Sequence, residues 1–151
     1  MSFRHLPPAH AIAQRVVFTA AYACTALAGT AALVFTPTTI AGTLGTWVTY
    51  VWAALAIVGG PVGLLAVATN RWRLELWAAP LALGGSAGYA IGVWSLVSGE
   101  TITRLTQASW ITVLVLLLLA RVIHVRAIAA AQRRRHDRHR RVRRILDDGE
   151  D

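Results

Sequence analysis

The chain has 151 residues, of which 56 % are hydrophobic and only 15 % are charged. A soluble domain carries about a quarter of charged residues, and residues 16–120 contain only five, so the composition excludes a separate soluble domain with its own core. The formal net charge of +8 is concentrated in residues 121–146, which hold ten arginines and one aspartate.

Four apolar runs follow a short basic leader, residues 1–15, which we expect to be cytoplasmic. The first run, of twenty residues, is long enough to cross a hydrocarbon core of ~30 Å as a helix. The first run also resembles a signal peptide, because Ala26-Leu27-Ala28 before Gly29 looks like a cleavage site. Its continuation to Phe35 favours a retained span. The transmembrane domain, residues 16–125, therefore has spans at about residues 16–35, 47–69, 76–97 and 108–125.

The fourth span continues without a glycine or a proline into an Arg-rich tail, residues 126–151, which ends in the acidic sequence DDGED. As one helix, residues 109–146 would be about 57 Å long. The predicted fold class is therefore all-α: a polytopic integral membrane protein with four transmembrane helices and a long, basic, cytoplasmic C-terminal helix.

The arginines predict the orientation. With both termini in the cytoplasm, Arg104 is the one arginine in an outer loop, and the other fourteen lie in inner segments. Tryptophans mark two levels, with Trp72 and Trp77 at the inner boundary and Trp47, Trp94 and Trp110 at the outer one. Both patterns predict a multi-pass protein with both termini in the cytoplasm.

The sequence shows no set of residues typical of catalysis, and we expect that the protein is not an enzyme and binds no cofactor or metal. Glu75 is placed in the inner loop of residues 70–75, and no ionisable side chain falls in the middle of a span, where transport paths need one. The cluster from His136 to His139 is predicted to be a solvated helix face. Cys24, the single cysteine, is predicted to be a small buried core residue.

Small residues recur one helical turn apart in the spans. Gly84, Gly88 and Gly92 form two overlapping GxxxG units, which permit close helix packing, whereas Gly85 points about 100° away from Gly84. Gly59 and Gly63 form another unit around Pro61, where a kink is expected. Either of two roles fits these rows: packing within one four-helix bundle, or helix self-association between copies.

The basic tail also has several interpretations. It could bind the anionic lipid of the inner leaflet, bind a cytoplasmic partner, or serve as a solvated tail that fixes the topology. Nucleic acid is disfavoured as a partner, because no aromatic residue is interleaved for base stacking. The residues predicted to make these contacts are Arg133, Arg134, Arg135, Arg138, Arg140, Arg141, Arg143 and Arg144.

The segment from TPTTIAGTLG through TNRWRLELWAAPLALGG, on a small four-span chain with a charged cytoplasmic end, resembles small membrane proteins of actinobacteriophages, some of which are holins. This resemblance implies a bacteriophage protein of host cell lysis that forms a homo-oligomer in the inner membrane and opens membrane lesions. The alternative is a non-enzymatic membrane adaptor whose Arg-rich tail binds anionic lipid or a cytoplasmic partner. A small channel or transporter subunit is a third, weaker hypothesis.

Overall fold

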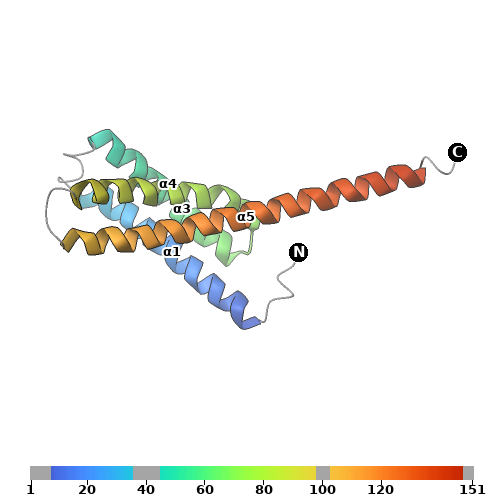
Figure 1. Ribbon diagram of the computed structural model, residues 1–151, viewed down its shortest axis with the longest axis horizontal. Helices are drawn as coiled ribbons and strands as arrows, with labels where there is room; N and C mark the ends of the chain where they lie inside the picture. The colour runs from blue at the N-terminus through green and yellow to red at the C-terminus, as the bar shows by residue number, and fades with distance from the viewer. Residues whose placement is uncertain (1–7, 36–44, 98–102, 148–151) are drawn as a thin grey trace.

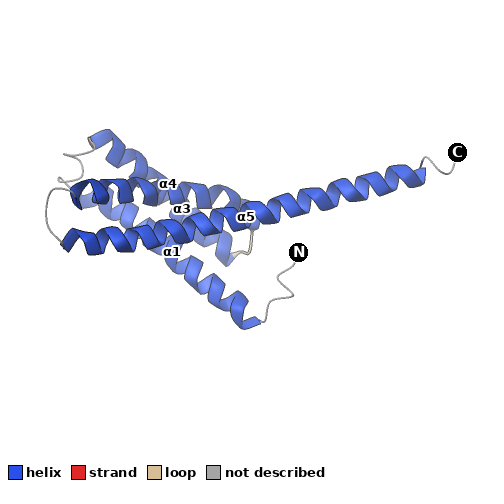
Figure 2. Ribbon diagram, in the orientation of Figure 1, coloured by secondary structure: helices blue, strands red, loops and turns tan. Residues whose placement is uncertain are grey.

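The computed structural model describes residues 8–35, 45–97 and 103–147, with side chains described for residues 12–34, 45–97 and 104–134. In these ranges every regular element is an α-helix (Figures 1 and 2). Four helices are long and apolar enough to cross a membrane, which confirms the all-α class and the number of candidate spans. They are α1 (Pro8–Phe35), α3 (Thr46–Ala68), α4 (Trp72–Val97) and α5 (Thr103–Asp147).

The helices pack mainly against their neighbours in the sequence. α3 lies between α1 and α4, and α4 lies between α3 and α5, while α1 touches α4 and α5 at few positions. Figure 1 shows that α1 and α4 begin, and α3 and α5 end, at the same end of the bundle. The first half of α1 diverges from the other helices there, and α5 projects beyond all of them (Figure 1).

The turn between α3 and α4 is short and well defined by hydrogen bonds. Asn70 adopts a left-handed conformation, with φ 55°. The Asn70 and Arg71 amides donate to the carbonyls of Val67 and Ala66, at 3.3 and 2.9 Å, which is the Schellman arrangement that ends a helix. α4 therefore begins at Trp72, so Glu75 lies in the first helical turn and not in the loop that was predicted from the sequence.

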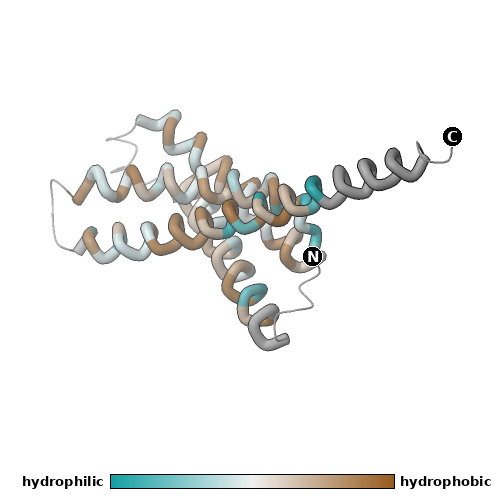
Figure 3. Tube along the Cα trace, turned by 45° about the vertical axis from the view of Figure 1, so that its right-hand side comes forward, coloured by the Kyte–Doolittle hydropathy of each residue, from teal (hydrophilic) through white to brown (hydrophobic). Residues whose placement is uncertain are grey.

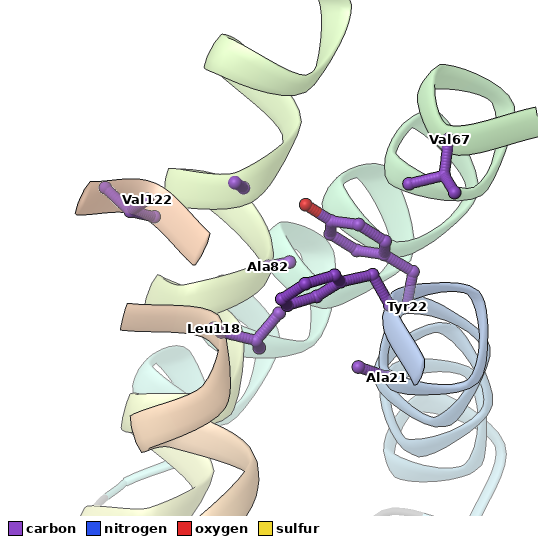
Figure 4. Close-up of a cluster of buried hydrophobic side chains, with 8 residues drawn as sticks. Ala21, Tyr22, Val67, Ala82, Leu118 and Val122 are labelled. Atoms are coloured by element: carbon purple, nitrogen blue, oxygen red, sulfur yellow. The ribbon is translucent and has the colours of Figure 1, made fainter. Parts of the chain in front are cut away.

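Alanine and glycine allow α1 and α3 to approach each other closely. A Cβ added at Gly29 would lie 2.8 Å from the Ala56 Cβ, and one added at Gly60 would lie 2.7 Å from the Ala26 backbone nitrogen. Since neither atom can give way easily, only glycine allows this approach. Larger residues, including Phe18, Tyr22, Val67 and Leu118, form a core cluster where all four helices meet (Figure 4).

Gly85 and Gly88 of α4 face α3 within the same chain. A Cβ added at Gly88 would lie 2.6 Å from the Trp52 Cβ, and Gly92 is buried. Gly85 is packed about as tightly, because its Cβ would lie 2.7 Å from the Ala56 backbone nitrogen. The expectation that Gly85 points away from the contact is therefore wrong: the contact face includes residues 85 and 88, while Gly84 meets only the end of Leu55, at 3.4 Å.

Two further expectations concern Pro61 and Cys24. α3 runs through Pro61 without interruption, and the kink there stays a prediction. Cys24 is exposed, so its assignment to the core is wrong. The buried face of α1 instead follows Phe18, Ala21 and Tyr22 and then Thr25, and Cys24 lies beside it.

Candidate functional site

The most unusual feature of the bundle is a buried ion pair between α4 and α5. Glu75 is 3 % exposed and Arg121 is 8 % exposed. The Arg121 Nε donates to the Glu75 Oε1 at 2.6 Å, and its Nη2 donates to Oε2 at 2.8 Å. Two parallel, charge-assisted hydrogen bonds fix the planes of both groups, so this contact also fixes the register of the two helices.

α1 completes this site with two aromatic side chains. The hydroxyl of Tyr22, which is fully buried, donates to the Glu75 Oε1 at 3.2 Å. The Phe18 ring lies under the guanidinium of Arg121, with its centroid 4.4 Å from the Arg121 Cζ, a distance suited to a cation–π contact. We call Phe18, Tyr22, Glu75 and Arg121 the polar cluster.

α3 contributes the space for the Tyr22 ring. A Cβ at Gly63 would collide with that ring, so the absence of a side chain at this position lets Tyr22 reach across from α1. Figure 4 shows Tyr22 directed from α1 into the interior, with Val67 of α3 on one side of it and Leu118 of α5 on the other. All four helices therefore meet at one level around a single carboxylate.

Helical spacing explains why these residues converge. Phe18 and Tyr22 are four residues apart and share one face of α1. Glu75 shares a face with the fully buried Ala78 and Ala79, and Arg121 shares one with Leu118 and Val125. A carboxylate in the first turn of α4 also lies at the positive end of the helix dipole.

The pair carries no net charge, which is what allows it to be buried. Removing either partner would leave a lone charge in an apolar interior, at a cost of about 3–5 kcal/mol. One nitrogen of the cluster, the Arg121 Nη1, is buried without a hydrogen-bond partner among the described residues. The two buried charges are therefore stabilised by their pairing and by the packing around them, although one polar atom of the cluster has no hydrogen bond.

Other polar contacts lie toward the opposite end of the bundle, one of them buried and two of them exposed. Thr25 and Ser86 hydroxyls lie 3.5 Å apart and join α1 to α4. Besides the ion pair, two side-chain hydrogen bonds join α5 to α4: the Gln107 amide donates to the Tyr89 hydroxyl at 2.5 Å, and the Trp94 indole donates to the Thr112 hydroxyl at 3.0 Å. These neutral contacts join neighbouring helices, and none of them pairs a nucleophile with a base.

The residues predicted as sites are dispersed over the chain. Gly59 packs against the α4 backbone at Leu81 and Ala82, and Gly63 packs against Tyr22. Gly84 and Gly88 of α4 face α3, and Gly92 is buried. Arg133 and Arg134 are exposed on α5. The side chains of Arg135, Arg138, Arg140, Arg141, Arg143 and Arg144 lie outside the described residues, although their backbone belongs to α5. Within the part of the chain described with side chains, no group of His, Cys, Asp and Glu could hold a metal ion.

No family model, curated protein or solved structure matches this chain. Its function is therefore inferred from its own geometry.

The polar cluster was not predicted from the sequence, although one signal for it was available. The apolar run between Arg104 and Arg121 is short for a span, so one of these arginines needs a partner inside the bundle. Glu75, near the inner end of the preceding helix, is the acidic residue that an antiparallel neighbour can supply at the depth of Arg121.

Proposed function

We propose that this protein is a non-enzymatic, multi-pass membrane anchor that presents a rigid basic arm to an acidic protein partner on the inner side of a bacterial membrane. The observation that supports this proposal is the length of α5, a single helix of 45 residues that continues past the bundle (Figure 1). We call residues 130–147 of α5 the basic arm.

The arm begins where burial in the bundle ends. Ala129, at 8 % exposed, is the last buried residue of α5 among those with described side chains. From there to Asp147 the helix extends for about 27 Å. The arm carries eight of the fifteen arginines of the chain, against the two acidic residues Asp137 and Asp147. Figure 3 also shows that hydrophilic positions gather where α3 turns into α4 and where α5 leaves the bundle.

The direction of the arm favours a partner in solution over the lipid surface. α5 continues along the line of its own span, so successive arginines lie farther from the bundle (Figure 1). Attraction to anionic lipid, about 1 kcal/mol per arginine near the surface, falls off within a Debye length of about 8 Å. Most of the arm would lie beyond that distance, where an acidic protein surface can reach it from the side.

The orientation rests on the same distribution of charge. The turn between α3 and α4 lies at the end of the bundle where α5 leaves it, and α5 begins at the other end (Figure 1). Arg71 and Arg73 belong to the first of these ends, and Arg104, in the first turn of α5, belongs to the second. Arginine-rich segments between short spans stay on the cytoplasmic side. The proposed orientation therefore has the arm, and both termini, inside the cell.

Binding to a simple polyanion tests the proposal. The full chain in nanodiscs of zwitterionic lipid should bind a poly-glutamate peptide, and the binding should weaken with added salt. Replacing Arg133, Arg134, Arg135, Arg138, Arg140 and Arg141 with Gln should weaken binding at least about tenfold, because each exposed charge pair contributes about 0.2–1 kcal/mol. Arg104→Gln, at the other end, is the control. Equal binding by the arm variant, or loss of the binding in nanodiscs of anionic lipid because the lipid occupies the arm, would contradict a protein-binding arm.

Pore formation of the holin type is the competing proposal. It relies on the glycine rows for contacts between copies, yet Gly59, Gly63, Gly85 and Gly88 all contact residues of their own chain, so copies would have to associate through other faces. Induced expression with a potential-sensitive dye separates the two proposals. An anchor accumulates at constant membrane potential, whereas timed depolarisation of the cells would favour the pore and reject the anchor.

A further inference from the structure

The fourth span presents a problem of length. Between Arg104 and Arg121 the chain has sixteen residues without a charge, Leu105–Ala120. As a helix this run measures about 24 Å, which is short of a hydrocarbon core of ~30 Å. If both arginines lay at the headgroups, the membrane would have to thin around α5.

The ion pair with Glu75 removes this mismatch. Arg121 is held at 2.6 and 2.8 Å from the two oxygens of Glu75, so it can lie below the headgroups without a net charge. The next arginine along α5 is Arg126, and it is exposed. The run Leu105–Val125 then measures about 32 Å, which matches the hydrocarbon core.

The other charges nearby do not compete for this role. Arg71 and Arg73 flank Glu75 in the sequence, but both are exposed and neither is paired with it. The Tyr22 hydroxyl and the Phe18 ring hold the two ends of the pair from α1. Val122 and Val125 follow Arg121 on α5, and both are buried, with 7 % and 1 % of their surface exposed. The segment after Arg121 therefore packs against the bundle when the ion pair is formed.

We propose that Glu75 is a positioning residue that sets the depth of α5: by pairing with Arg121 it moves the inner boundary of the fourth span from Arg121 to Arg126. This determines where the basic arm leaves the membrane, and it rests on the membrane anchor proposed above. Without Glu75, the charged guanidinium of Arg121 is solvated best when it reaches the lipid headgroups. α5 would then shift toward the inner side by about one turn, or about 5 Å.

Cysteine accessibility measures this depth in the full chain. In a Cys24→Ala background, single substitutions Ala120→Cys, Ile123→Cys, Ala127→Cys and Ala130→Cys all lie at exposed positions of α5, so labelling reports depth and not packing. A membrane-impermeant maleimide added from the inner side should label residues 127 and 130 and spare 120 and 123. In the Glu75→Gln variant, residue 123 should also become labelled.

Charge variants separate positioning from a general loss of structure. Arg121→Gln, alone or together with Glu75→Gln, removes the charge that would draw α5 inward, so the boundary should stay near residue 126. A merely structural pair would disturb the boundary in all three variants. If the Glu75→Gln variant does not accumulate, a double variant that exchanges the two residues, Glu75→Arg with Arg121→Glu, tests the proposal instead. It should restore both the protein level and the boundary near residue 126.

Each outcome bears on one proposal. Labelling of residue 123 in the otherwise unchanged chain, an unshifted boundary in Glu75→Gln, or failure of the exchange to restore the boundary would overturn the positioning role while leaving the anchor intact. Labelling of residues 127 and 130 only from the outer side would instead overturn the inner placement of the arm, and with it the proposed function.

Discussion

At the scale of single residues, Tyr22 makes the contact that brings α1 to the ion pair. Its ring is fully buried and occupies the space left by Gly63, while its hydroxyl reaches the Glu75 carboxylate. Packing and hydrogen bonding at this residue can therefore be separated by substitution.

Tyr22→Phe keeps the ring and removes the hydrogen bond to Glu75. We expect the free energy of unfolding to fall by about 1 kcal/mol, since one hydrogen bond to a charged group is lost while the packing stays. Tyr22→Ala should cost about 3–5 kcal/mol, because a large buried side chain leaves a cavity. Titration with a denaturing detergent in bicelles measures both values. Tyr50→Phe, at a side chain that is 44 % exposed, is the matched control and should change little; an equal loss in Tyr50→Phe would contradict the role of the buried hydroxyl.

At the scale of helices, α3 and α4 pack through positions where a side chain would not fit. Gly59 of α3 rests on the α4 backbone, and Gly85 of α4 rests on the α3 backbone at Ala56. In a membrane, close contact of this kind must drive helix association, because lipid supplies no hydrophobic difference between the helices and their surroundings.

Gly85→Leu and Gly88→Leu should both weaken this contact. Inserting a large side chain into a well-packed site costs about 1–3 kcal/mol or more. Gly84→Leu is the control, since its Cβ would meet only the terminal methyl of Leu55. Protein level and detergent-resistant folding should fall for residues 85 and 88 and change less for residue 84. Folded Gly88→Leu monomers that lose intermolecular crosslinks would indicate that another copy occupies this face.

At the scale of the whole molecule, the four helices place the beginning of α1 and the end of α5 at the same end of the bundle (Figure 1). The turn between α3 and α4, which is flanked by Arg71 and Arg73, lies at that end as well (Figure 1). One orientation in the membrane therefore decides the side of every charged segment.

Accessibility tags should reveal that orientation. Tags at Asn70 and at the C-terminus should react from the inner side, and tags at Gly42 and Gly99 from the outer side, because arginine-rich segments remain in the cytoplasm. Glycosylation-type or cysteine reporters in a bacterial host can measure all four positions. A C-terminus on the outer side would reject the basic arm as a cytoplasmic binding element.

The sequence by itself determined the number and type of the helices and the segregation of charge. Both follow from local physics: apolar runs such as Trp47–Ala68 are long enough to span a membrane only as helices, and the ten arginines of residues 121–146 mark one end of the chain. The sequence also identified glycine as the residue of close contact in the second and third spans, because that property depends on size alone.

Only the tertiary structure decided which residues meet. A helical row such as Gly84, Gly88 and Gly92 leaves open which edge faces a neighbour, and the crossing of α3 and α4 selected Gly85 instead of Gly84. Glu75 and Arg121 are 46 residues apart, and each alone suggests a side chain directed toward water. Their pairing depends on the antiparallel register of α4 and α5, because an ion pair is buried only where two charges arrive at the same depth with matching geometry.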